Sequence, residues 1–108
     1  MKIFFSDSAI DKLNEIHACE NICLTSTRSL AEAEPGITSL VVRANETDFS
    51  KYGQVFNTHI GSIYVDKYAF QILGSDNKID FDSFRDVLIL IVDGDIVNDN
   101  LHLDFKLN

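Results

Sequence analysis

A run of six apolar residues at positions 87–92, VLILIV, limits what this chain can fold into more than any other feature. Most of these residues are β-branched, and such a run predicts a strand covered on both faces at the centre of the core. Asp93-Gly94 follows at once and favours a type I′ hairpin turn, in which both central residues have positive φ. The returning strand is predicted at residues 101–107, where apolar and polar residues alternate.

The rest of the sequence combines short strand patterns with two helical ones. After an opening strand, Ser6, Asp7 and Ser8 supply N-cap oxygens for an amphipathic helix that is predicted to run to about Ala18. A short helix is predicted at residues 67–73, with Gly74 as its positive-φ C′ residue. The further predicted strands cover residues 2–5, 21–27, 38–44, 55–60, 62–66 and 78–82, with Gly61 marking a turn, a bulge or a close backbone approach.

These elements predict a mainly β fold of the α+β class. We expect a distorted barrel or sandwich of about seven strands, with the N-terminal amphipathic helix closing one side and one short helix elsewhere. The chain lacks the βαβα alternation of a parallel, doubly wound sheet. Its 108 residues are the usual size of one domain. We therefore expect a single domain over residues 1–108.

The charge balance argues against two classes of partner. Asp and Glu number 17 against 9 Lys and Arg, and the net charge of -8 repels nucleic acid and the anionic face of a membrane. The excess follows Ser75, and it fits a solvated surface, a basic partner or a bound cation. No apolar run reaches the roughly 18 residues of a membrane span, and the first apolar stretch is too short for a signal peptide. We expect a cytoplasmic protein.

Two groups of residues are candidates for metal binding, and each has a structural alternative. His17, Cys19 and Cys23 could hold zinc or share an iron–sulfur cluster with a second subunit. The spacing H-x-C-x3-C is not a standard ligand pattern, however, and Cys23 lies in a predicted strand. The second group offers the hard oxygen donors that calcium prefers. It does not follow the spacing of an EF-hand calcium loop, so a polar hairpin explains it better. Its members are Asp93, Asp95, Asn98, Asp99 and Asn100.

The sequence offers no catalytic motif. It contains no G-x-S-x-G elbow and no Gly-rich phosphate loop, and no pair of carboxylates stands out for acid and base catalysis. Each histidine has a plain structural place, with His17 on a helix flank, His59 in a strand and His102 on the solvated face of the last strand. We therefore expect a protein that is not an enzyme.

Three stretches, taken in order, resemble the HesB-like, or A-type, iron–sulfur cluster biosynthesis family. The opening MKIFFSDSAIDKLNEI is similar to the family's first strand and helix start. The stretch YGQVFNTHIGSIYVDKYAFQILGSDNKIDFD is similar to its strand, short helix, Leu-Gly and Ile-Asp-Phe sequence, and LHLDFKL to the closing strands of the short forms in low-GC Gram-positive bacteria. The resemblance implies a compact β-rich fold and a scaffold or carrier that accepts and hands on iron or a cluster.

The resemblance does not extend to the cysteines of the family, which are one thiolate in the middle of the chain and a C-x-C pair near the C-terminus. Residues 34–37 contain no Cys, and residues 94–100 hold Asp and Asn in place of the pair. Hard oxygens do not replace thiolates as cluster ligands. Cys19 and Cys23 match neither family position, so no ligand can be carried over to this chain.

Two functional interpretations stay open. The first is a divergent, non-catalytic scaffold or carrier that still binds iron or a cluster through Cys23, Cys19 or a dimer interface. The second is a metal-free binding or protein-interaction module that keeps the fold. In either case the resemblance implies protein partners from iron–sulfur assembly, with the chain acting as a monomer or a homodimer.

Overall fold

The structure is a computed structural model that describes residues 2–16, 20–26, 40–47, 49–50 and 52–105. Within them the chain is mainly β with two helices, as the sequence predicts. It has eight strands where about seven are predicted, and each of the eight is paired with a neighbour. The elements are β1 (Lys2–Phe5), α1 (Asp7–Glu15), β2 (Cys23–Ser26), β3 (Leu40–Ala44), β4 (Gln54–Thr58), β5 (Gly61–Val65), α2 (Lys67–Ile72), β6 (Asp76–Asp82), β7 (Val87–Val92) and β8 (Asp95–Phe105).

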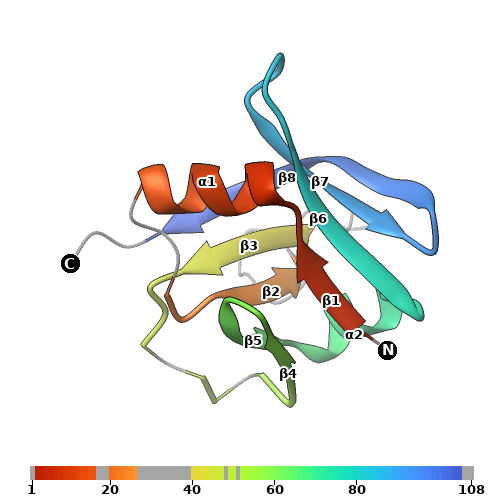
Figure 1. Cartoon of the computed structure of the whole chain (residues 1–108). Helices are drawn as coiled ribbons and strands as arrows, with labels where there is room; N and C mark the ends of the chain where they lie inside the picture. Colours follow the sequence, from red (N-terminus) through yellow and green to blue (C-terminus); the bar gives the residue numbers. More distant parts are fainter. Residues whose placement is uncertain (1, 17–19, 27–39, 48, 51, 106–108) are drawn as a thin grey trace.

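The strands follow the hydrogen-bonded order β1-β6-β7-β8-β3-β2-β5-β4. This order divides into two mixed sheets that share the long strand β8, which pairs with β7 through its first part and with β3 through its last part. β8 therefore carries the chain from one sheet to the other (Figure 1). The end strands β1 and β4 are not paired with each other in the described residues, so the barrel is open.

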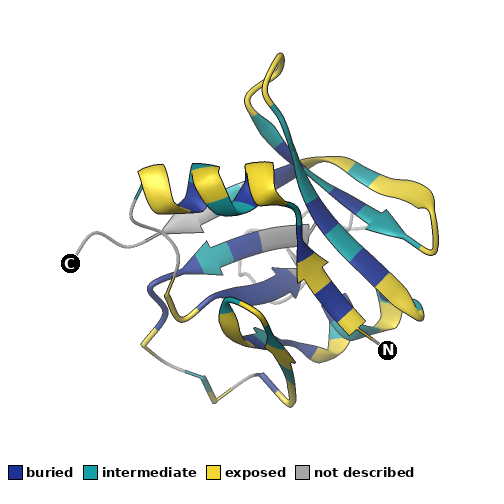
Figure 2. Cartoon of the chain, viewed as in Figure 1, coloured by how far each residue is buried: buried dark blue, intermediate teal, exposed yellow. Residues whose placement is uncertain are grey.

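The core lies between the two sheets and α1. Figure 2 shows buried positions gathered there and exposed positions at the hairpin ends. Leu88 and Leu90 of β7 are buried in this core, whereas Val87, Ile89 and Ile91 on the opposite face are only half-buried. The prediction that this strand is covered on both faces is therefore wrong. β7 lies between β6 and β8 in the sheet, and only its face that carries Leu88 and Leu90 meets the core.

The start of α1 is fixed by the predicted cap. The Ser6 hydroxyl oxygen accepts a hydrogen bond from the Ala9 N–H (3.2 Å) and donates one to Asp80 Oδ1 on β6 (2.6 Å). The hydrogen bond from Ser6 is the main reason that the pKa of Asp80 lies below its usual range. The helix ends at Glu15, before the predicted end near Ala18, with Ile16 as its C-cap. Ile16 is also the last residue of the apolar stripe to pack against the core.

The hairpin between β7 and β8 has the predicted turn. Asp93 and Gly94 have φ values of 49° and 89°, as a type I′ turn requires. β8 begins directly after this turn at Asp95, six positions before the predicted start at Leu101. Asp95 pairs with Val92 of β7, so the polar residues after the turn belong to the strand. Register shifts between β7 and β8 interrupt the alternation of inward and outward side chains, and the first part of β8 therefore lacks an alternating apolar pattern in the sequence.

The short helix α2 is present where predicted, but its two ends differ from the prediction. Asp66 is its N-cap and not the last residue of a strand, and its Oδ1 accepts a hydrogen bond from the Ala69 N–H (2.8 Å). Gly74 does not have positive φ. A Cβ at this position would overlap the Asp93 carboxylate and would lie 2.8 Å from Val92 Cγ1. Gly74 is therefore required by close approach to the β7–β8 turn.

Candidate functional site

The structure describes one of the two cysteines that the sequence proposes as metal ligands. Cys23 lies in β2, paired with Arg43 on β3 and with Tyr64 on β5, and its side chain is fully buried. Its thiol donates a weak hydrogen bond to the Asn21 carbonyl oxygen at 3.8 Å. Cys19 and His17 lie outside the described residues, as do residues 34–37. The proposed group of His17, Cys19 and Cys23 is therefore not tested.

Cys23 belongs to a buried polar cluster. Tyr52 and Glu46 are both buried, and Arg43 Nη1 lies 3.4 Å from Glu46 Oε2. Burial raises the pKa of the Tyr52 hydroxyl well above its usual range, and the neighbouring Cys23 adds to this effect. The phenol thus stays protonated at neutral pH. Cys23, Arg43, Glu46 and Tyr52 thus form one group of interacting polar side chains between β2, β3 and the segment that follows β3.

The described residues do not fit an iron–sulfur cluster. Cluster binding needs several thiolates that can reach the same iron and sulfide atoms. Among the described residues, no three side chains of His, Cys, Asp or Glu lie together in a way that could hold a metal ion. The one described thiol is buried and engaged with a carbonyl oxygen.

The group of hard oxygen donors at the β7–β8 turn and in β8 includes side chains that accept hydrogen bonds from backbone N–H groups. Asp93 accepts hydrogen bonds from the N–H groups of Ser75 (3.3 Å) and Asp76 (2.9 Å), which ties the β7–β8 turn to the start of β6. Asn98 Oδ1 accepts one from the Asn100 N–H at 2.9 Å within β8. These contacts favour the predicted structural interpretation of the group.

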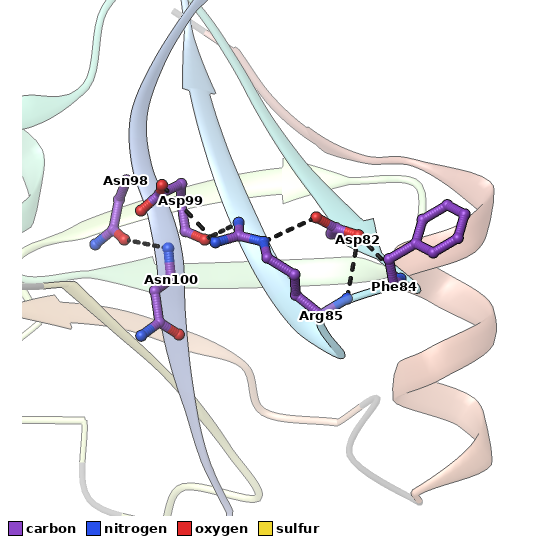
Figure 3. Close-up of polar contacts among 6 residues, drawn as sticks. All are labelled: Asp82, Phe84, Arg85, Asn98, Asp99 and Asn100. Atoms are coloured by element: carbon purple, nitrogen blue, oxygen red, sulfur yellow. Dashed lines mark hydrogen bonds and ion pairs between the residues drawn. The ribbon is translucent and has the colours of Figure 1, made fainter.

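The four-residue turn between β6 and β7, residues 83–86, is held by several side-chain hydrogen bonds, and we call it the hairpin tip. Asp82 closes it, because its Oδ1 accepts from the N–H of Phe84 (3.0 Å) and of Arg85 (3.4 Å) and its Oδ2 accepts from Arg85 Nε (3.0 Å). Arg85 Nη2 also donates to the Asp99 carbonyl oxygen on β8 at 2.6 Å (Figure 3). Two strands therefore hold this turn.

The hairpin tip presents an aromatic ring to solvent. The side chain of Phe84 is completely exposed, whereas Arg85 pairs with Asp82 and Asp86 pairs with Lys12. Asp86 adopts a φ of 56°, and its carboxylate lies 3.2 Å from Lys12 Nζ on α1. The hydrogen bond from Arg85 lowers the pKa of Asp82. The strand and helix patterns of the sequence do not indicate this feature, although a Phe between Ser83 and Arg85 in a polar turn is a signal for it.

A cleft of about 250 Å³ lies beside β2 and β5, and it has no evident catalytic chemistry. Its lining offers one carboxylate, that of Glu20, together with Asn21, Ile22, Ile60, Gly61, Ser62, Ile63 and Tyr64. His59 is near in sequence, but it lies exposed in the β4–β5 turn and not in a strand as predicted. Gly61 begins β5 with a φ of 115°, which fits its predicted turn role. No helix in the described residues has the length and apolar character to cross a membrane.

Comparison with known proteins gives one consistent result. The family model described as "Iron-sulphur cluster biosynthesis" matches residues 1–105. No curated protein matches the chain. A proposed Fe–S biosynthesis protein from Lactobacillus salivarius, described as having a novel fold, is similar in structure, with a TM-score of 0.74, 19% identity, and coverage of 97% of this chain and 98% of that one.

A second solved structure, of a proposed Fe–S biosynthesis protein from Lactobacillus acidophilus, has a TM-score of 0.68 and 19% identity, with coverage of 97% of this chain and 88% of that one. At this level of identity the likeness to both structures concerns the fold. It confirms that the open, two-sheet arrangement of the described residues is an architecture that other proteins adopt.

Proposed function

Since the chain belongs to the iron-sulphur cluster biosynthesis family, we propose that it serves cluster biosynthesis as a non-catalytic, single-domain cytoplasmic protein. In this role it contacts protein partners of the assembly process and holds no cluster on thiolates of its own. The family match over residues 1–105 supports the place in cluster biosynthesis. The burial of Cys23, the one thiol among the described residues, supports the proposal that the chain holds no cluster on its own thiolates.

A second candidate is a carrier in the usual sense, whose cargo is iron or a cluster. The family match over nearly the whole chain favours it, since family members are expected to keep the family's task. Such a carrier needs thiolates. Cys19 would have to provide one, and a second copy of the chain would have to provide others, because Cys23 is not accessible.

Anaerobic reconstitution separates the two candidates. Protein purified without oxygen is given ferrous iron, sulfide and a reductant, then desalted, and its iron, sulfide and visible spectrum are measured. We expect a colourless protein with no retained sulfide. A stoichiometric cluster that is lost in Cys19→Ser but kept in Cys23→Ser would establish the carrier and contradict our proposal.

Complementation tests the biological role separately from cluster binding. We expect deletion of the gene to lower the activity of iron–sulfur enzymes in iron-limited cells, while enzymes without iron keep their activity. The double variant Cys19→Ser, Cys23→Ser should restore activity if it folds, because the proposed role uses neither thiol. Unchanged iron–sulfur enzyme activity in the deletion strain would refute the role itself.

A further inference from the structure

We propose that the hairpin tip is a docking element, in which Phe84 enters an apolar pocket of a folded partner protein whose rim carries Lys or Arg side chains. This inference rests on the proposed function for the process in which the partner takes part. Three properties of the tip favour docking: its exposure, the hydrogen bonds that hold its backbone, and its charge.

The exposure of Phe84 alone would not carry the argument, since single apolar side chains are common on protein surfaces. The position of the ring distinguishes it. The β6–β7 hairpin projects from the body of the molecule at the top of Figure 1, and its turn is exposed in Figure 2. A fully exposed aromatic ring at the end of a projecting hairpin can enter a concave surface without displacing other parts of the chain.

The second property is that hydrogen bonds hold the backbone of the tip in one conformation. The backbone N–H of Phe84 is held by Asp82, and the next residue, Arg85, is bound to both Asp82 and Asp99 (Figure 3). On the other side, Asp86 contacts Lys12 of α1. A ring presented on a turn with its conformation already fixed loses little backbone entropy on binding, which favours its use as an anchor.

The negative charge at the tip and over the whole chain favours a partner with positive charge. Asp86 in the tip and Asp99 on β8 have side chains that are each 71% exposed, although Asp86 pairs with Lys12 and Asp99 with Arg85. The guanidinium of Arg85 is also bound to the Asp82 carboxylate and to the Asp99 carbonyl oxygen. The whole chain carries a net charge of -8, so a second copy, a nucleic acid or an anionic membrane would be repelled. A partner with basic groups around its pocket is attracted to the exposed carboxylates.

The first experiment places a photocrosslinking phenylalanine analogue at position 84 of the full chain in the native host, with the same analogue at position 55 as the control. Val55 is also an exposed apolar residue, but it lies on β4 and not on the hairpin. We expect an adduct that forms from position 84 and not from position 55, and that contains another protein. Mass spectrometry then identifies this protein, which is purified for binding measurements.

The second experiment measures affinity and salt dependence with the identified protein. Phe84→Ala should weaken binding by about tenfold or more, Phe84→Leu should restore part of the loss, and Val55→Ala should leave the dissociation constant unchanged. The double variant Asp86→Asn, Asp99→Asn should slow association and reduce its dependence on salt. Because Phe84 is fully exposed, Phe84→Ala should keep the urea midpoint of the parent, which excludes unfolding as the cause.

Three results would overturn the docking proposal: equal crosslinking from positions 84 and 55, an adduct made only of two copies of this chain, or an affinity that Phe84→Ala does not change. An identified partner with no part in iron–sulfur assembly would instead sustain docking and count against the proposed function. The complementation experiment decides the function even where no tip-specific adduct forms, so the two failures are distinguishable.

Discussion

Replacing Asn77 tests whether one buried amide joins three segments of the fold. Asn77 is fully buried in β6. Its Nδ2 donates to the carbonyl oxygens of Lys2 (2.8 Å) and Gly74 (3.0 Å), and its Oδ1 accepts from the Gly74 N–H (2.9 Å). One side chain thus connects the start of β1, the turn after α2 and the beginning of β6.

The expected cost of Asn77→Ala follows from these three hydrogen bonds. Each contributes about 1 kcal/mol net, and backbone groups left without a partner in a partly buried place add to the loss. We expect a decrease of about 3 kcal/mol in the free energy of unfolding. That is a large part of the roughly 5–15 kcal/mol typical of a domain. With an m-value of about 1.5 kcal/mol/M, the urea midpoint should fall by about 2 M.

Equilibrium urea unfolding, followed by circular dichroism at pH 7, measures this loss. Asn57→Ala is the matched control, because Asn57 is exposed and its Oδ1 accepts a hydrogen bond from the Ser62 hydroxyl at the surface (3.1 Å). We expect the control to change stability by less than about 0.5 kcal/mol. A loss below about 1 kcal/mol for Asn77→Ala would show that the amide does not join these segments, and the reasoning would be refuted.

Three further predictions concern stability measured by urea unfolding. Thr25→Val should cost about 2 kcal/mol, because the buried Asp66 carboxylate loses a hydroxyl donor; no loss would contradict the role of that contact. The pKa of Asp80 is lowered in the folded state, so its contribution to the free energy of unfolding is full above about pH 4 and is lost as the pH falls through the folded pKa. In Asp80→Asn the free energy of unfolding should therefore decrease less steeply between about pH 4 and lower pH. The same decrease in the variant and the parent would refute this prediction. Gly74→Ala should cost about 1–3 kcal/mol through overlap, whereas Gly53→Ala, with open space around it, should be nearly neutral; equal effects would contradict the packing argument.

Local chemistry explains which parts of the fold the sequence could predict. The Asp93-Gly94 turn and the Ser6 cap depend on the conformation and hydrogen bonding of neighbouring residues, and both are present. The Asp66 cap is equally local, but the strand predicted at residues 62–66 includes Asp66, and this part of the prediction is wrong. The positive φ predicted for Gly74 is also wrong, because packing against the distant Asp93, and not a helix C′ conformation, favours glycine there.

Long-range contacts explain what the sequence could not show about the site. The burial of Cys23 depends on strands β3 and β5 and on Tyr52, which the pattern around Ile22 and Leu24 does not reveal. The hairpin tip depends equally on distance, since Arg85 reaches Asp99 across fourteen positions of the chain. The residues of both features are far apart in the sequence, and they become neighbours only through the order of the strands.

The acidic character of residues 76–99 has two physical origins that composition alone cannot separate. Asp80, Asp82 and Asp93 accept hydrogen bonds from serine hydroxyls, an arginine or backbone N–H groups, so their charges maintain the structure. Asp86 and Asp99 also form ion pairs, with Lys12 and Arg85, but their side chains stay mostly exposed. Because the first group is committed to the fold, a basic partner would be attracted chiefly by the second, and neutralising Asp86 and Asp99 should alter association more than stability.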